Sequence, residues 1–179
     1  HHIIILAKTQ EGLKNIYKLV SYSHLDYYYK KPRLPWSVIE ANREGLIIGS
    51  ACSAGEVFSS MVKHVTYQKR TRTEKIMEQK SAEEQARIAS RYDYLEIQPV
   101  INNRFMFDEE FYLDGRRIEN EDDIREINRR IVALADKLGK RVVATTDSHY
   151  TEPDDAIYRN IVMACMGFED AESGEGLYM

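Results

Sequence analysis

An aspartate and a histidine, two residues apart, follow a short apolar run near the end of this 179-residue sequence. The run, 141–145, is rich in β-branched residues and predicts a buried strand. Side chains two residues apart in an extended segment point the same way, so Asp147 and His149 are expected to project together. A carboxylate oxygen beside an imidazole nitrogen suits a divalent metal ion. In the structural alternative, Asp147 accepts hydrogen bonds from loop amides and His149 packs on Tyr150.

A cysteine lies among small residues that follow a second apolar run. Residues 46–48 predict a strand, and the segment 49–56 (GSACSAGE) comes directly after it. Small residues at the end of a strand allow another group to approach the backbone closely. Cys52 is therefore either a soft metal ligand or a buried, inert thiol.

Apolar runs alternate with helical patterns along the chain, and this alternation predicts an α/β fold. The expected strands cover 2–8, 46–48, 92–98 and 141–145. The expected helices cover 11–23, 36–42, 81–89 and 121–138, with two more that begin near Gly55 and Pro153. Such an order is typical of a parallel sheet with flanking helices. Glu96, within the third strand, is either a neighbour of a functional site or a solvent-facing carboxylate.

Two basic segments each have a functional and a structural interpretation. Interleaved tyrosines and lysines in 27–31 (YYYKK) could bind nucleic acid by stacking and charge, but we expect a loop whose rings fold onto a neighbouring helix. Lysines and arginines in 69–80 could meet phosphate, but a solvated helix face is the favoured prediction. His64, which precedes them, is expected at the surface.

The composition is that of an ordinary globular domain. Hydrophobic residues make up 43% of the chain, charged residues 30%, and the net charge is −4, which gives no overall basic field for nucleic acid. No apolar run approaches the roughly 20 residues of a membrane span, and two cysteines make a disulfide framework improbable. We therefore expect a cytoplasmic protein. The first residue is His1, so the chain is expected to be a piece of a longer protein, or to carry a tag remnant at His1–His2.

Four sequence blocks carry a resemblance to a known family. They are 2–8 (HIIILAK) with 12–21, 45–52 (GLIIGSAC) with 55–56, 93–99 (DYLEIQP), and 142–150 (VVATTDSHY) with 153–154. In this order they resemble the PHP (polymerase and histidinol phosphatase) domain of PolC-type DNA polymerase III, the replicative α subunit of low-GC Gram-positive bacteria. No single block is diagnostic, whereas the ordered set is specific and spans nearly the whole chain.

The resemblance implies a partial PHP-type distorted α/β barrel, with parallel strands and flanking helices, that holds divalent metal ions. Four positions match ligands of that family: His2, Cys52, Asp147 and His149. A soft thiolate with imidazole and carboxylate suggests zinc, manganese or both, and magnesium would serve the parent polymerase. The family's His-x-His motif and its later His and Glu ligands are absent, because in that family they lie upstream of an inserted exonuclease.

Residues 1–168 are therefore expected to be the C-terminal part of a PHP domain, and 169–179 a linker toward the polymerase core. The parent would be a DNA-directed DNA polymerase, a nucleotidyltransferase with a 3′–5′ exonuclease, and this segment alone would be inactive. Its partners would be the remainder of the polymerase and, through it, DNA, with no membrane. Two alternatives remain: a free-standing metal-dependent phosphoesterase, and a metal-free scaffold in which Cys52 and His149 are core residues.

Overall fold

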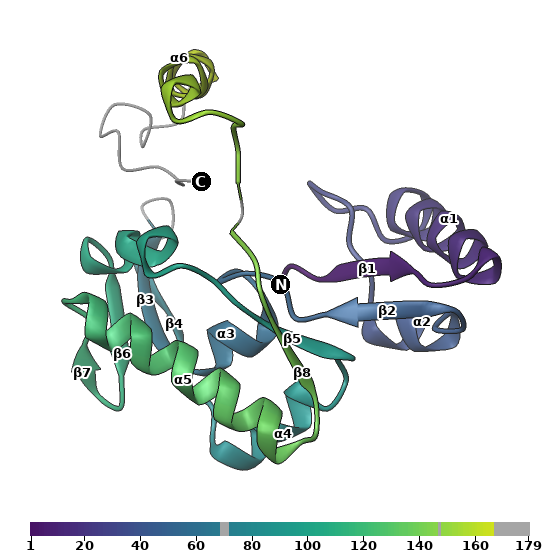
Figure 1. Ribbon diagram of the computed structural model, residues 1–179, viewed down its shortest axis with the longest axis horizontal. Helices are drawn as coiled ribbons and strands as arrows, with labels where there is room; N and C mark the ends of the chain where they lie inside the picture. Colours follow the sequence, from purple (N-terminus) through teal and green to yellow (C-terminus); the bar gives the residue numbers. More distant parts are fainter. Residues whose placement is uncertain (69–71, 147, 167–179) are drawn as a thin grey trace. The chain divides into compact units, whose positions relative to one another are not determined.

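The structure, a computed structural model, describes residues 1–68, 72–146 and 148–166. The chain divides into two compact units, which are drawn in Figure 1. The small unit is Ile3–Gly49, and the large unit joins His1–His2 to the chain from Ser50 onward. Among the described residues, every helix is too short or too polar to span a lipid bilayer.

The small unit contains two strands and two helices. In chain order these are β1 (Ile4–Ala7), α1 (Gln10–Leu25), α2 (Trp36–Ala41) and β2 (Leu46–Gly49). The two strands pair antiparallel, from Ile4 opposite Gly49 to Ala7 opposite Leu46. The alternation of elements predicted parallel strands, but strand direction depends on distant pairing that no local pattern records.

A close backbone contact holds α1 of the small unit in place. Thr9 caps the helix, because its Oγ1 accepts the Gly12 N–H at 3.1 Å. A Cβ at Gly12 would lie only 1.9 Å from the carbonyl oxygen of Gly45, so only glycine fits there. Asn15 donates through Nδ2 to the Glu44 carbonyl at 2.9 Å. Small and polar side chains therefore seat this helix, while Tyr17 lies 64% exposed.

A parallel strand pair forms the centre of the large unit. β5 (Tyr94–Ile97) and β8 (Arg141–Ala144) run in register from Tyr94 opposite Arg141 to Ile97 opposite Ala144. The helix α5 (Glu121–Lys137) packs against both strands, as Figure 1 shows. Two shorter helices, α3 (Glu56–Ser60) and α4 (Ala82–Ala89), pack on one another and on α5. The predicted α/β class, with parallel strands and flanking helices, is confirmed.

The core of the large unit follows the apolar stripe of α5. Ile124, Ile127 and Ile131 are fully buried, at the spacing of one helical face, and Leu95 of β5 is equally buried. Asn120 caps the helix, because its Oδ1 accepts the N–H groups of residues 122 and 123. The strong local pattern explains why this helix could be predicted within a residue of its observed ends.

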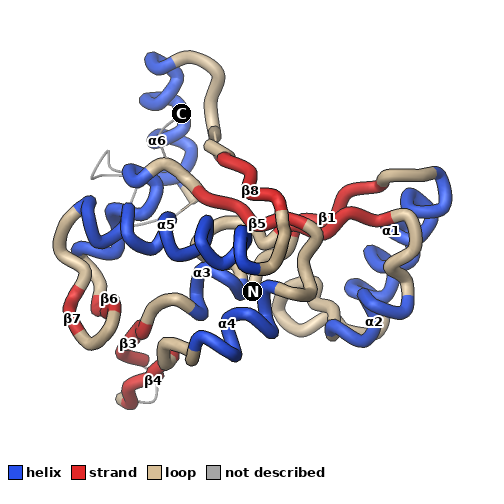
Figure 2. Tube along the Cα trace, turned by 60° about the horizontal axis from the view of Figure 1, so that its bottom comes forward, coloured by secondary structure: helices blue, strands red, loops and turns tan. Residues whose placement is uncertain are grey.

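An antiparallel sheet in the large unit was not predicted. Its order is β4-β3-β6-β7, from β3 (Lys63–Gln68), β4 (Thr73–Met77), β6 (Glu110–Leu113) and β7 (Arg116–Arg117). Figure 2 shows these strands together at one side of the unit. The predicted basic helix face over 69–80 is therefore wrong, because 73–77 form β4; residues 69–71 lie outside the described residues. The 3-10 helix η1 (Val100–Phe107) precedes β6.

Pairing of β3 with β6 also covers most of the His64 side chain. His64 lies opposite Phe111, and the two rings stack with centroids 3.8 Å apart. Its Nε2 lies 3.0 Å from Glu109 Oε2, and the side chain is 18% exposed. The prediction of a surface histidine is wrong because it took no account of this strand pairing.

The last described helix forms as predicted but buries no side chain. After the short η2 (Pro153–Asp155), α6 runs over Ala156–Cys165. Ile157, Ile161 and Val162, which share its apolar face, are each more than half exposed.

A charged network joins the β6–β7 turn to α5. Asp114 has φ 50°, and Gly115 follows with φ 79°, the pair of left-handed residues that a two-residue hairpin turn needs. Arg130 donates to both Asp114 oxygens, at 3.1 and 2.6 Å, and Gln79 Nε2 donates to Oδ1 at 2.8 Å. These hydrogen bonds, Arg130 first, lower the pKa of Asp114 from 3.8 to about 2.

Asp114 should make the free energy of unfolding of the chain depend on pH in the acid range. Its folded pKa lies below its unfolded value, so its contribution is present above about pH 4 and is lost as the pH falls toward 2. The side chain is 57% exposed, so we expect only about 1 kcal/mol or less. In urea unfolding, Asp114→Asn should be less stable than wild type at pH 6, with the difference disappearing near pH 2. Asp136→Asn, an exposed control on α5, should show no such pH-dependent difference.

Candidate functional site

The segment that carries Cys52 is a tight turn with a strained backbone. The Gly55 N–H donates to the Cys52 carbonyl at 2.8 Å. A Cβ at Gly55 would lie 2.1 Å from the Ser50 carbonyl oxygen, so this position requires glycine. Ala51 has φ 60°, a left-handed conformation that residues with a Cβ rarely adopt. Such strain is maintained only where the surrounding contacts hold it.

His2 lies beside this turn. Its backbone N–H donates to the Ala54 carbonyl at 2.9 Å, and it forms a parallel bridge with Gly55. The imidazole Nδ1 is 3.7 Å from Cys52 Sγ. The neighbouring His1 instead places its Nδ1 3.1 Å from Ser59 Oγ. The structure therefore brings together two predicted site residues that are fifty positions apart in sequence.

The spacing of the His2 and Cys52 donor atoms fits a shared metal ion. Zinc binds sulfur at about 2.3 Å and histidine nitrogen at about 2.0 Å, so at a tetrahedral angle the two donors lie roughly 3.6 Å apart. The observed separation is 3.7 Å. His2 is exposed and Cys52 is half-buried, so an ion can reach both from solvent. The same 3.7 Å separation is also that of a hydrogen bond between the Cys52 thiol and the His2 imidazole, so the pair is compatible with a metal ion without requiring one.

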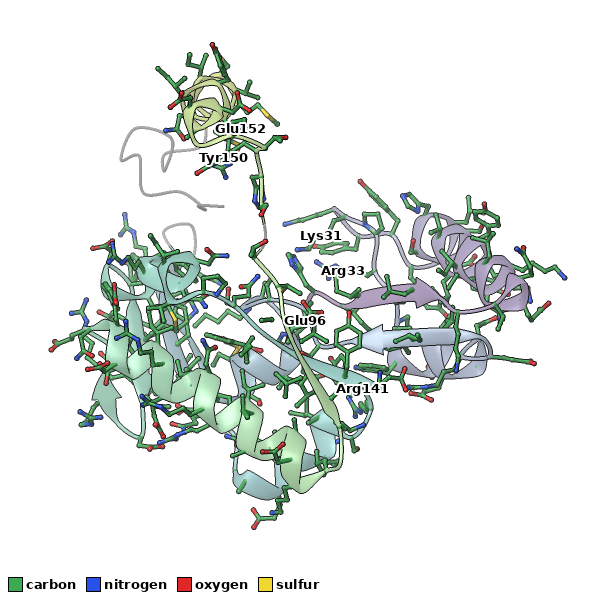
Figure 3. All side chains as sticks on the ribbon, viewed as in Figure 1. Lys31, Arg33, Glu96, Arg141, Tyr150 and Glu152 are labelled. Carbon is green, nitrogen blue, oxygen red and sulfur yellow. The ribbon has the colours of Figure 1, made fainter. Side chains whose placement is uncertain are left out.

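Glu96 is a buried carboxylate that joins the Cys52 turn to the end of β8. It is 7% exposed, and its Oε1 accepts the Ala51 N–H at 3.3 Å. Its Oε2 accepts the hydroxyl of Thr145 at 3.1 Å, one residue beyond β8. Its own N–H donates to Ser50 Oγ at 2.8 Å. Figure 3 labels Glu96 among the side chains of β5. The solvent-facing alternative for this residue is therefore wrong.

A tyrosine hydroxyl completes the surroundings of this carboxylate. Burial raises the pKa of Tyr94 to about 12, and the negative charge of Glu96 and its hydrogen bond with Tyr94 add to the shift. Tyr94 therefore remains a neutral hydrogen-bond donor at physiological pH. Sequence reasoning named Glu96 but could not assign this role, because two of its partners, Ala51 and Thr145, lie 45 and 49 positions away along the chain.

The other two predicted ligands follow the end of β8. Asn102 Nδ2 donates to the Thr146 carbonyl at 2.6 Å, which anchors the chain one residue before Asp147. Asp147 itself lies outside the described residues. His149 is exposed. Within 1–68, 72–146 and 148–166, no three His, Cys, Asp or Glu side chains are grouped closely enough to hold a metal ion.

Comparison with known proteins identifies the family. The chain matches the PHP domain family over residues 1–100, and it belongs to that family. Its mixed α/β structure agrees with the distorted α/β barrel expected of a PHP domain.

The similar proteins with curated names are DNA polymerases. The DNA polymerase III PolC-type of Clostridium perfringens is 46% identical over 178 residues, 99% of this chain and 11% of that protein. The proteins of the same name from Halalkalibacterium halodurans and Bacillus subtilis are 41% and 42% identical, over 93% of this chain and 10% of each protein. The resemblance to the PHP domain of PolC-type DNA polymerase III is thus confirmed. The chain spans about a tenth of the length of these relatives.

Proposed function

We propose that this chain is a metal-binding segment of the PHP domain of a PolC-type replicative DNA polymerase. The observation that carries the proposal is the 3.7 Å approach of His2 Nδ1 to Cys52 Sγ, in a chain whose relatives are named as such polymerases. Residues 1–168 would form the C-terminal part of the domain, and 169–179, outside the described residues, would lead toward the polymerase core. The remainder of the polymerase would be its partner and would contact DNA.

Four side chains would hold the ion: His2, Cys52, Asp147 and His149. Thiolate and imidazole favour zinc, while a carboxylate also accommodates manganese. The hydrogen bonds of Glu96 support this proposal, because its carboxylate accepts from Ala51, next to Cys52, and from Thr145, two positions before Asp147 in the sequence. A bound divalent ion would supply positive charge that cross-links the Cys52 turn to the segment after β8.

The segment would support DNA synthesis in the parent without performing it. The 179-residue chain, supplied with zinc or manganese, should neither extend a primed DNA template nor hydrolyse a phosphomonoester such as p-nitrophenyl phosphate above the level of Cys52→Ala. The reason is that this chain carries only part of the family's ligand set. Gel-based primer extension and release of nitrophenolate measure the two activities.

Two results would contradict this assignment in different ways. Phosphomonoester hydrolysis by wild type that is lost in Cys52→Ala would favour a free-standing phosphoesterase. A full-length parent protein that does not extend a primer would remove the link to replication. Normal synthesis by the parent, with an inactive 179-residue chain, is the outcome we expect.

A further inference from the structure

The last two residues of α1 and the segment that follows them are exposed along their whole length. We call residues 24–33 (HLDYYYKKPR) the tyrosine–lysine loop; every residue in it is exposed. The side chains of Tyr27, Tyr28 and Tyr29 are 40%, 56% and 61% exposed. The prediction that these rings fold onto a neighbouring helix holds only for Tyr28, whose ring centroid lies 6.5 Å from that of His24 in α1, and that ring is still more than half exposed. Three adjacent exposed aromatic rings offer a surface on which a flat ligand can stack.

Local contacts, rather than a core, hold the tyrosine–lysine loop in shape. Lys30 has φ 62°, and Tyr29 forms an antiparallel bridge with Lys31 across it. The hydroxyl of Tyr28 donates to the Lys30 carbonyl at 3.2 Å. The loop thus turns back on itself and presents its side chains outward. Two of these side chains, Lys31 and Arg33, are labelled in Figure 3.

Cations lie directly against an aromatic ring in the tyrosine–lysine loop. Lys30 Nζ is 5.6 Å and Arg33 Cζ 5.1 Å from the centroid of the Tyr29 ring, distances at which cation–π attraction acts. The loop carries Lys30, Lys31 and Arg33 against the single carboxylate Asp26, so its charge is 3 − 1 = +2. The chain as a whole has a net charge of −4. Positive charge is therefore concentrated where the exposed rings are.

We propose that the tyrosine–lysine loop binds single-stranded nucleic acid. Unpaired bases would stack on Tyr27 and Tyr28, while Lys30, Lys31 and Arg33 would contact the phosphates. Single strands offer flat apolar base faces for the exposed rings and negative phosphates for the three cations. A duplex hides its base faces, and an acidic peptide would meet the cations but leave the rings uncovered. The proposal goes beyond the proposed function and does not depend on a metal ion.

The test measures binding of fluorescently labelled oligodeoxythymidine to the 179-residue chain by anisotropy, with a chelator present. Tyr27→Ser combined with Tyr28→Ser should weaken binding by roughly tenfold or more, since base–aromatic stacking contributes about 1–3 kcal/mol per base. Lys30→Gln combined with Lys31→Gln should reduce the slope of log affinity against log salt by about 1.4, because each phosphate contact contributes about 0.7.

The matched control replaces an exposed tyrosine and lysine of α1 outside the tyrosine–lysine loop. Tyr17→Ser combined with Lys14→Gln should leave both affinity and salt slope unchanged. Circular dichroism checks that all three variants keep the wild-type helix content and melting temperature. The proposal is overturned if wild type does not bind the single strand at low salt, or if the tyrosine variant binds it as well as wild type does. It is also overturned if wild type binds double-stranded DNA more tightly than the single strand. If the double tyrosine variant does not fold, the single variant Tyr28→Ser takes its place and should also bind the single strand more weakly than wild type.

Discussion

Replacing Cys52 by alanine should abolish the thiolate-to-metal charge-transfer absorption that appears when cobalt(II) is added to the wild-type chain. Cobalt(II) occupies zinc sites and reports a sulfur ligand directly. The expected loss in zinc affinity exceeds about 100-fold, because removal of a residue that merely orients a ligand already costs 10- to 100-fold. The 3.7 Å separation of Cys52 Sγ from His2 Nδ1 is the structural reason, since both atoms can reach one ion.

The chain supplies its own control for this cobalt experiment. Cys165, the second cysteine, is exposed on α6, and Cys165→Ala should keep the full absorption. A protein with an intact site should also gain about 2.7 kcal/mol of unfolding free energy at a zinc concentration 100 times the dissociation constant. Equal absorption from wild type and Cys52→Ala would exclude Cys52 as a ligand.

Replacing Glu96 by alanine should destabilise the chain by about 3–5 kcal/mol. The change leaves three donors without their acceptor: the Ala51 N–H and the hydroxyls of Thr145 and Tyr94. A buried donor that loses its partner costs about 1–3 kcal/mol. Urea unfolding followed by circular dichroism measures the loss. Glu84→Ala, an exposed glutamate on α4, should change stability by no more than about 0.5 kcal/mol.

Glu96→Gln separates the charge of this residue from its shape. Glutamine retains one acceptor oxygen, so the loss of stability should be smaller than for alanine. The pKa of Tyr94 should fall below about 12, because the negative charge that disfavours the phenolate is gone, yet remain above 10 because burial, the larger cause, persists. Ultraviolet titration of the tyrosines measures this shift. A wild-type titration curve for Glu96→Gln would show that the carboxylate does not act on Tyr94, and full stability in Glu96→Ala would show that it does not hold the Cys52 turn.

Local patterns predicted those elements that local interactions determine. The helix predicted over 121–138 is α5, whose position follows from the stripe Ile124, Ile127 and Ile131; the caps Thr9 and Ser81 hold the starts of α1 and α4 through contacts within one turn. The turn at 114–115 is equally local, because Asp-Gly is one of the few dipeptides that readily adopt two left-handed conformations. Each of these features depends on residues within one or two helical turns of one another.

Features that depend on distant pairing were missed. Residues 63–68 (KHVTYQ) pair with 73–77 and with β6, and the basic side chains nearby suggested a helix instead. The antiparallel direction of β1 and β2 likewise has no local signal. The exposure of the rings in the tyrosine–lysine loop was also missed. Whether another element covers a ring depends on the tertiary structure, which composition does not specify.

The candidate site lies between these two cases. The meeting of His2 with Cys52 was expected from the family resemblance and not from spacing, since fifty residues separate them. The role of Glu96 could not be predicted from the sequence, because its two carboxylate oxygens accept hydrogen bonds from residues on two other segments of the chain. Asp147 and His149 as partners of Cys52 remain a prediction.

The most direct test of the metal proposal is therefore the cobalt titration repeated on Asp147→Ala combined with His149→Ala. If Cys52, His2 and the segment after β8 share one ion, this variant should bind cobalt at least about 100-fold more weakly than wild type, with Cys52 unchanged. Cobalt binding equal to that of wild type would show that Asp147 and His149 are not ligands, and the shared site would have to be abandoned.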